Sequence, residues 1–211
     1  MHVKEIWRYP VKSLAGEQIE QSQVSTLGLS GDREILVLGA NGRVITSRTH
    51  PRLLGLKGTT SAEGQVQING HHWQSSEALA LVAEAVGLGA QLILDTSANR
   101  FDILPLLVAT DGAIAHMGFD GRRLRPNIVI GGVKGLEERT WPGHRLQIGK
   151  VILAPAQLRG RCVMTTYDPD TQKQDLNILR RIVRELDGVM ALDTAVEAEG
   201  QIRVGDPVTK M

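Results

Sequence analysis

Cysteine is nearly absent from this chain, which has one among 211 residues, Cys162. A single cysteine cannot form an internal disulfide, so a disulfide framework is excluded and a reducing compartment is expected. If Cys162 has a chemical role, it acts as a thiol or thiolate.

Long apolar runs are also absent. No stretch approaches the roughly 18 apolar residues of a membrane span, and the N-terminal segment MHVKEIWRYP lacks the pattern of a signal peptide. We therefore expect a cytoplasmic protein without a membrane partner.

The chain also lacks an excess of one charge, because it has 24 Lys and Arg residues and 23 Asp and Glu residues, which gives a net charge of +1. This balance gives no global attraction for nucleic acid, so an anion site would have to be local.

Several catalytic motifs are missing. Gly143 to Lys150 comes closest to a phosphate-binding loop, but it has five residues between its glycines and Val151 where Ser or Thr is required. The chain has no G-x-S-x-G elbow, no G-x-G-x-x-G after a strand and no H-E-x-x-H pair. Serine-hydrolase, dinucleotide-binding and zinc-protease functions therefore have no support.

Short apolar runs separated by turns dominate what is present. Before residue 75 they predict strands at Val3 to Arg8, Gln18 to Leu27, Glu34 to Leu38, Arg43 to Thr46, Leu53 to Lys57 and Val66 to Asn69. Later runs predict strands at Gln91 to Leu94, Ile103 to Ala109, Asn127 to Ile130, Val151 to Leu153 and Gln201 to Val204. The pattern favours a barrel or curled sheet over a doubly wound α/β layer.

Two segments have helical spacing. The first, Ser75 to Val86, starts at a serine cap and ends at Gly87, and we expect it to divide the chain into two parts. The second starts at Asp175 and should end at Gly188.

The single cysteine follows basic residues in Arg159-Gly160-Arg161-Cys162. Positive charge close to a thiol favours the nucleophilic, metal-binding thiolate. A lone cysteine also commonly packs as a small hydrophobic residue, and from the residues alone both interpretations stay open.

Arginines also stand at strand ends and turns, at Arg8, Arg33, Arg48 and Arg125. Lys12-Ser13, after the rigid Tyr9-Pro10, adds an ammonium and a hydroxyl group. Guanidinium groups that converge from different loops form a pocket for phosphate or other oxyanions. The spacing equally allows separate surface arginines, and both alternatives remain.

In order along the chain, these segments resemble those of MOSC proteins, the family that includes the C-terminal part of molybdenum cofactor sulfurase and the amidoxime-reducing components. The N-terminal matches are Arg8-Tyr9-Pro10-Val11-Lys12-Ser13, Gly28-Leu29 with Gly31-Asp32-Arg33, and Ile45-Thr46-Ser47-Arg48. The later ones are Phe101-Asp102 with Pro105, Arg125-Pro126-Asn127-Ile128-Val129, Arg161-Cys162 with Thr165-Thr166, Asp168-Pro169-Asp170-Thr171 and Val204-Gly205-Asp206-Pro207.

The resemblance implies a mainly β fold with a few helices (α+β), in which a MOSC-type β-barrel is packed on a smaller N-terminal β-barrel module. We place the N-terminal module at residues 1–75 and the MOSC domain at residues 76–211.

It further implies that the two modules bind molybdenum cofactor, with Cys162 as the catalytic residue and protein ligand to the metal. The implied cofactor-binding residues are Lys12, Ser13, Arg33, Ser47, Arg48, Arg125, Asn127 and Arg161. Where relatives have a serine-bearing segment that contacts the cofactor, this chain has Thr110-Asp111-Gly112-Ala113, so Thr110 is the implied contact there.

The hypothesis is an oxidoreductase that reduces N-hydroxylated small molecules. One cysteine cannot hold an iron–sulfur cluster, so electrons are expected from a separate electron-transfer protein. Two alternatives remain open: a non-catalytic carrier of molybdenum cofactor, and a sulfur carrier with a persulfide on Cys162.

Overall fold

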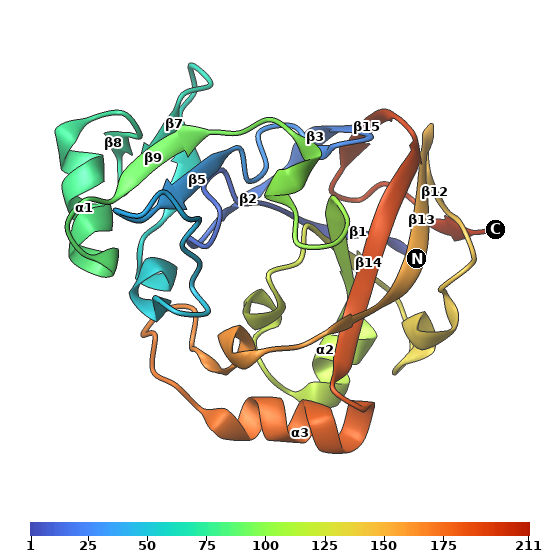
Figure 1. Ribbon diagram of the computed structural model, residues 1–211. Helices are drawn as coiled ribbons and strands as arrows, with labels where there is room; N and C mark the ends of the chain where they lie inside the picture. Colours follow the sequence, from blue (N-terminus) through green and yellow to red (C-terminus); the bar gives the residue numbers. More distant parts are fainter.

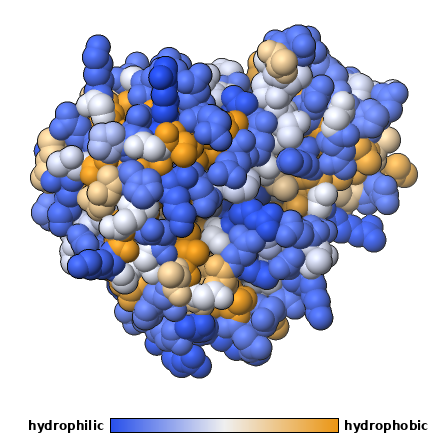
Figure 2. Space-filling view, turned by 180° about the vertical axis from the view of Figure 1, so that it is seen from behind, coloured by the Kyte–Doolittle hydropathy of each residue, from blue (hydrophilic) through white to orange (hydrophobic).

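The computed structural model describes residues 1–211, the whole of the given sequence. Most regular structure is β-sheet, with three α-helices and five short 3₁₀ helices, so the α+β prediction is confirmed. Figure 1 shows α1 with β5, β7, β8 and β9 on one side of the molecule, and β12, β13 and β14 on the other. Seen from behind, hydrophilic residues cover most of the surface and apolar residues form small separate patches (Figure 2).

The largest sheet has eight strands in the order β16-β12-β13-β14-β10-β11-β1-β2. Their bounds are β1 His2–Arg8, β2 Glu17–Ile19, β10 Leu106–Thr110, β11 Ile128–Gly131, β12 Leu146–Ile148, β13 Val151–Gly160, β14 Val189–Ala198 and β16 Thr209–Lys210. All neighbours are antiparallel except β10 and β11. The β13–β14 register shifts at three points, and such irregularities increase the bend and twist of a strand pair.

The main core lies against this sheet and includes Trp141, Ile6 and Leu106, which are fully buried. A three-stranded sheet beside it contains β3 (Gln21–Ser25), β4 (Gly28–Leu29) and β15 (Gly200–Arg203). Every residue of β10 and β11 is buried, as expected for strands covered on both faces. These two strands therefore form a fixed base for the loops at their ends.

A second core belongs to the N-terminal part. Its strands are β5 (Ile35–Leu38), β6 (Gly58–Thr60), β7 (Val66–Ile68), β8 (His71–His72) and β9 (Gln91–Leu94). The helix α1 (Ser76–Val86) contributes Ala78 and Val82 to the same cluster as Val37. As predicted, α1 is capped by Ser75, which accepts a 3.1 Å hydrogen bond from the Ala78 amide. The division of the chain after residue 75 stays a prediction.

Two helices pack on the other face of β10 and β14. They are α2 (Asp111–Met117) and α3 (Leu176–Leu186), and their cluster includes Met117 and Ile182. The predicted second helix is confirmed as α3, because Asp175 caps its start and the chain turns into the left-handed region at Asp187. None of the helices has the length and apolar content that a membrane crossing requires.

Some sequence-based expectations were wrong. The segment predicted as a strand at Leu53 to Lys57 begins instead as the 3₁₀ helix η1 (Pro51–Gly55), because Pro51 sets a helical φ in its first turn. Arg43 to Thr46 makes only an isolated bridge, between Val44 and Leu38. The helix α2 and the ten-residue strand β14 were not predicted.

The segment that connects β9 to β10 is fixed by Arg100, at the end of η2 (Ala98–Arg100). Its buried guanidinium donates hydrogen bonds to four backbone carbonyls, those of Leu27, Asp32, Thr96 and Ser97. One side chain therefore joins the loops that precede β5 to the start of the connecting segment.

Candidate functional site

A cleft lies where the N-terminal loops meet the large sheet, and most of the predicted site residues line it. Eight of the ten do so: Lys12, Ser13, Arg33, Arg48, Arg125, Asn127, Arg161 and Cys162. They come from five separate stretches of the sequence. The predicted convergence of arginines holds for Arg33, Arg48 and Arg125, whereas Arg8 pairs with Glu17 at 2.8 Å instead.

The backbone is constrained at three of these positions. Ser13, Arg33 and Arg125 have φ values of 74°, 57° and 57°, in the left-handed region that side chains other than glycine rarely adopt. Such a conformation costs about 1–2 kcal/mol per residue, so packing must enforce it. Hydrogen bonds from the Lys12 amide to the Ile35 carbonyl (2.8 Å) and from the Arg33 amide to the Tyr9 carbonyl (2.7 Å) do so for two of these turns. Residues held in this way are typical of binding sites.

The cleft is strongly basic although the chain as a whole is nearly neutral. Its only acidic lining residue is Asp102. Its basic lining residues are Lys12, Arg33, Arg48, Arg123, Arg125, Arg159 and Arg161. A local excess of positive charge of this size attracts anions.

Several of these cations have a carboxylate partner. The two oxygens of Asp102 contact Lys12 Nζ and an Arg48 Nη atom, each at 2.9 Å. Partial burial acts to raise the pKa of Asp102, but these two cations outweigh it and lower that pKa. Arg159 forms an ion pair with the fully buried Asp193, and Arg33 with the fully buried Asp32.

Two cations, Arg125 and Arg161, have no carboxylate partner. Burial lowers the pKa of each guanidinium to about 10, so both stay charged at neutral pH. Arg161 donates one 2.8 Å hydrogen bond to the Leu124 carbonyl, and its buried Nε has no partner. Arg125 lies over the ring of Tyr9. These two groups remain available for an anion.

Cys162 lies between Arg161 and the 3₁₀ helix η5 (Val163–Thr166), just after the end of β13. It is half-buried and lies outside all three hydrophobic cores. Its carbonyl accepts hydrogen bonds from the Thr165 amide (3.1 Å) and hydroxyl (2.8 Å), which fix the backbone. Of the two interpretations left open by the sequence, the structure therefore favours a thiol at the cleft over a core hydrophobe.

Ser47 and Thr110 do not line the cleft. Ser47 is fully buried, and its Oγ donates to the Sδ of Met164, which does line it. Thr110 ends β10, caps α2 through the Ala113 amide and donates to Glu138, a buried carboxyl whose pKa is raised by burial. The strand β10 reaches the cleft only near its other end, at Leu107.

Asn127 lines the cleft but is fully buried, and its side-chain oxygen is already engaged. It accepts hydrogen bonds from an Arg33 Nη atom (3.2 Å) and from the Leu107 amide (3.1 Å). Asn127 therefore orients Arg33 and fixes the start of β10.

The amino-acid sequence matches two known families. Residues 1–97 match the MOSC N-terminal beta barrel domain, and residues 108–209 match the MOSC domain. The chain belongs to the MOSC family. It is 28% identical to mitochondrial amidoxime reducing component 2 of Homo sapiens, over 99% of this chain and 83% of that protein. It is 25% identical to mitochondrial amidoxime-reducing component 1 of Homo sapiens, over 98% of this chain and 82% of that protein.

A solved structure has the same fold at low identity. The YuaD protein from Bacillus subtilis aligns with a TM-score of 0.54 and 13% identity, over 98% of this chain and 93% of that chain. The cleft of this MOSC chain lies between its two matched domains, and Phe101, Asp102 and Leu104 come from the segment that neither match includes.

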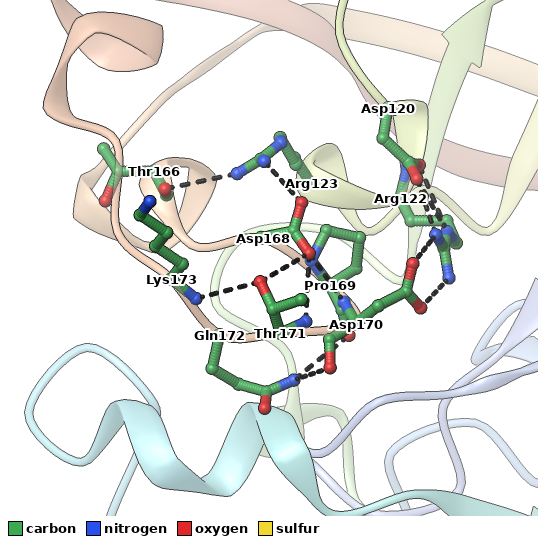
Figure 3. Close-up of polar contacts among 10 residues, drawn as sticks. All are labelled: Asp120, Arg122, Arg123, Thr166, Asp168, Pro169, Asp170, Thr171, Gln172 and Lys173. Atoms are coloured by element: carbon green, nitrogen blue, oxygen red, sulfur yellow. Dashed lines mark hydrogen bonds and ion pairs between the residues drawn. The ribbon is translucent and has the colours of Figure 1, made fainter.

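Three further residues line the cleft but were not among the predicted site residues: Arg123, Arg159 and Asp102. Arg159 was noted as a basic neighbour of Cys162, and Asp102 belongs to the family segment Phe101-Asp102. Arg123 belongs to the basic run before Pro126, and the turn starting at Asp168 supplies its partner. Figure 3 shows Asp168 facing Arg123, at 2.8 Å, and Arg122 between Asp120 and Asp170. The acidic turn Asp168-Pro169-Asp170-Thr171 was therefore a usable signal, because its carboxylates need cationic partners.

Proposed function

We propose that this protein is a molybdenum-cofactor-dependent reductase of N-hydroxylated small molecules. The observation that carries the proposal is the juxtaposition, in one basic cleft, of Cys162 with two cations that lack carboxylate partners, Arg125 and Arg161. The names of the relatives, amidoxime reducing components, support the same chemistry.

The residues present fit this cofactor. A molybdopterin carries an anionic phosphate and a heterocycle rich in hydrogen-bonding groups, and an orphaned Arg161 Nε inside a basic cleft is suited to such a ligand. A half-exposed thiol supplies the soft sulfur ligand that a transition metal prefers. Lys12, Ser13, Arg33, Arg48, Arg125 and Arg161 would hold the phosphate and pterin, and Cys162 would hold the metal.

Three of the predicted residues have different positions in this scheme. Ser47 would act through Met164 and Asn127 through Arg33, since each is hydrogen-bonded to that neighbour. Thr110, on the far end of β10, is left out of the proposed set.

The bound cofactor would supply the two-electron reduction that cleaves the N–O bond of the substrate. This reaction consumes two electrons and two protons and releases water with the amine or amidine. A separate electron-transfer protein would provide the electrons. The protein's own contribution is to fix the cofactor through charge and sulfur and to bind the substrate.

The decisive experiment measures molybdenum by elemental analysis in protein purified from a host that makes the cofactor. Wild type should contain molybdenum and reduce benzamidoxime with a chemical electron donor. Cys162→Ser should lose the metal, while Arg180→Met, on the exposed face of α3, should keep both properties. If the wild-type protein contains molybdenum but does not reduce benzamidoxime, the enzymatic proposal is contradicted and a cofactor carrier is favoured. A persulfide adduct on Cys162, detected by mass spectrometry, would favour sulfur transfer.

A further inference from the structure

A second cavity adjoins the basic cleft at Arg123, Arg125 and Met164. These three residues line both the basic cleft and this cavity. Its remaining wall is largely aromatic and aliphatic and includes Trp7, Tyr9, Leu54, Tyr167 and Pro169. Cys162 does not line it.

The polar groups around this cavity are almost all engaged with the protein itself. The guanidinium of Arg122 is held by Asp120 and Asp170 on either side, and that of Arg123 by Asp168 (Figure 3). The Trp7 indole N–H donates to Glu5 at 2.7 Å, and the Tyr9 hydroxyl donates to the Pro126 carbonyl at 3.2 Å.

Two of the lining side chains are exceptions, because the guanidinium of Arg125 and the hydroxyl of Tyr167 have no ion-pair or hydrogen-bond partner within the protein. The cavity therefore offers apolar walls, one free cation and one free hydroxyl group.

The walls are also rigid. The segment at Gly16 packs so closely on Tyr9 that a Cβ there would lie 2.6 Å from the ring and 2.4 Å from the Arg8 carbonyl oxygen. On the opposite side, Asp168 accepts hydrogen bonds from the Asp170 and Thr171 amides, at 3.1 and 3.0 Å, and thereby closes the turn that carries Pro169. A preformed cavity with fixed aromatic and aliphatic walls favours a ligand with an apolar body that matches its shape.

We infer that this cavity binds the planar aromatic body of the substrate, so that aromatic N-hydroxylated compounds are favoured over small aliphatic ones. The inference rests on the proposed function and deepens it. A substrate ring in the cavity reaches the basic cleft beside Met164, whose unbranched side chain adapts its shape readily.

The pterin of the cofactor is a poorer occupant. Its ring carries several hydrogen-bond donors and acceptors, which need partners when buried, and the side chains here supply only two free groups, on Arg125 and Tyr167. The basic cleft, with its many cations, provides such partners.

The test compares benzamidoxime with acetamidoxime, which has a methyl group in place of the ring, on molybdenum-loaded protein. In Leu54→Trp the added indole fills the cavity, and in Tyr167→Ala one aromatic wall is removed. Each variant should raise KM for benzamidoxime about tenfold or more, with kcat and the acetamidoxime kinetics unchanged. Leu88→Trp, at a position that is 94% exposed, is the matched control and should behave as wild type.

A binding measurement separates this inference from the proposed function. Isothermal titration calorimetry should show benzamidoxime binding to wild type and much weaker binding to Leu54→Trp, whether or not either compound is reduced. If wild type binds benzamidoxime but reduces neither compound, the reductase proposal fails and the ring site stands. Two results would overturn the ring site: equal effects of the variants on both substrates, or unchanged benzamidoxime binding in both folded variants. A loss of molybdenum from Leu54→Trp would also overturn it, because that result would place the pterin in the cavity.

Discussion

The guanidinium carbon of Arg125 lies 4.3 Å from the centroid of the Tyr9 ring, and the guanidinium carbon of Arg33 lies 5.0 Å from the same centroid. One aromatic ring from the N-terminal module therefore stabilises two cations of the cleft through cation–π contacts. Burial raises the pKa of Tyr9 to about 12, so the ring stays neutral at physiological pH. Tyr9 links the basic cleft to the apolar cavity, since it contacts the cations of the one and forms a wall of the other.

Tyr9→Phe should destabilise the protein by about 1 kcal/mol, because the buried Pro126 carbonyl loses its hydrogen bond from the hydroxyl group. The ring itself remains, so the cations should keep their positions. Urea unfolding at neutral pH measures the difference. An unchanged unfolding free energy together with a lowered molybdenum content would show that the hydroxyl group acts on the ligand instead.

Arg161→Met should raise the stability of the cofactor-free protein by about 1 kcal/mol and lower its molybdenum content. The folded protein holds this guanidinium charged despite burial, with an unpartnered Nε, and a methionine of similar length removes that cost. Urea unfolding and elemental analysis give the two readouts. A destabilised Arg161→Met protein would mean that the charge is satisfied within the fold.

Arg159→Met should have the opposite effect on stability, although it lies two residues away. Its loss leaves the carboxylate of Asp193 buried without its cation, and breaking a buried pair in this way costs about 3–5 kcal/mol. The same urea series measures it. Equal stabilities for Arg159→Met and Arg161→Met would contradict the assignment of one paired and one unpaired arginine.

Glu138→Gln should reduce the pH dependence of stability. Burial raises the pKa of Glu138 in the folded state, so its contribution is complete below its ordinary value of 4.5 and is lost as the pH rises through the folded pKa. The stability of wild type should therefore fall relative to Glu138→Gln as the pH rises above 4.5 and through the raised pKa of the folded state. Thr110→Val, which removes the hydrogen bond to Glu138, should leave molybdenum content unchanged.

Local signals in the sequence were sufficient to predict α1 and α3. Ser75 and Asp175 cap α1 and α3 with hydrogen bonds to amides two or three residues on, and glycines follow both helices. Both interactions join residues that are close together in the chain, so they can be predicted from the local sequence.

The strand β14 could not be recognised in the same way. It has five consecutive buried residues, Met190 to Thr194, because the main core covers one of its faces and the cluster of α2 and α3 covers the other. The alternation that marks a half-exposed strand is therefore missing, and its burial depends on partners far away in the sequence.

The residue types of the site were predictable from the sequence, but the position of each residue in the fold was predictable only in part. Lys12, Arg125 and Cys162 meet because they lie near the ends of β1, β11 and β13, which belong to one sheet whose strand order the sequence does not state. Arg33 joins them through the hydrogen bond from its amide to the Tyr9 carbonyl. Thr110 lies away from the cleft because it is at the end of β10, whereas the strand lines the cleft near its start, at Leu107. Asp102 was part of the recognised motif, but its contact with both Lys12 and Arg48 depends on the path of the connecting segment.

The four carbonyls bound by Arg100 have a kinetic consequence. All four lie on the N-terminal side of the cleft, within residues 27–97, so detaching the connecting segment from that side would require breaking several hydrogen bonds to a buried charged group at once. Such a release is rare, so the nearby cleft residue Asp102 keeps its place once the chain has folded. Association of a ligand should therefore follow a single concentration-dependent phase, without a slower step in which the connecting segment moves.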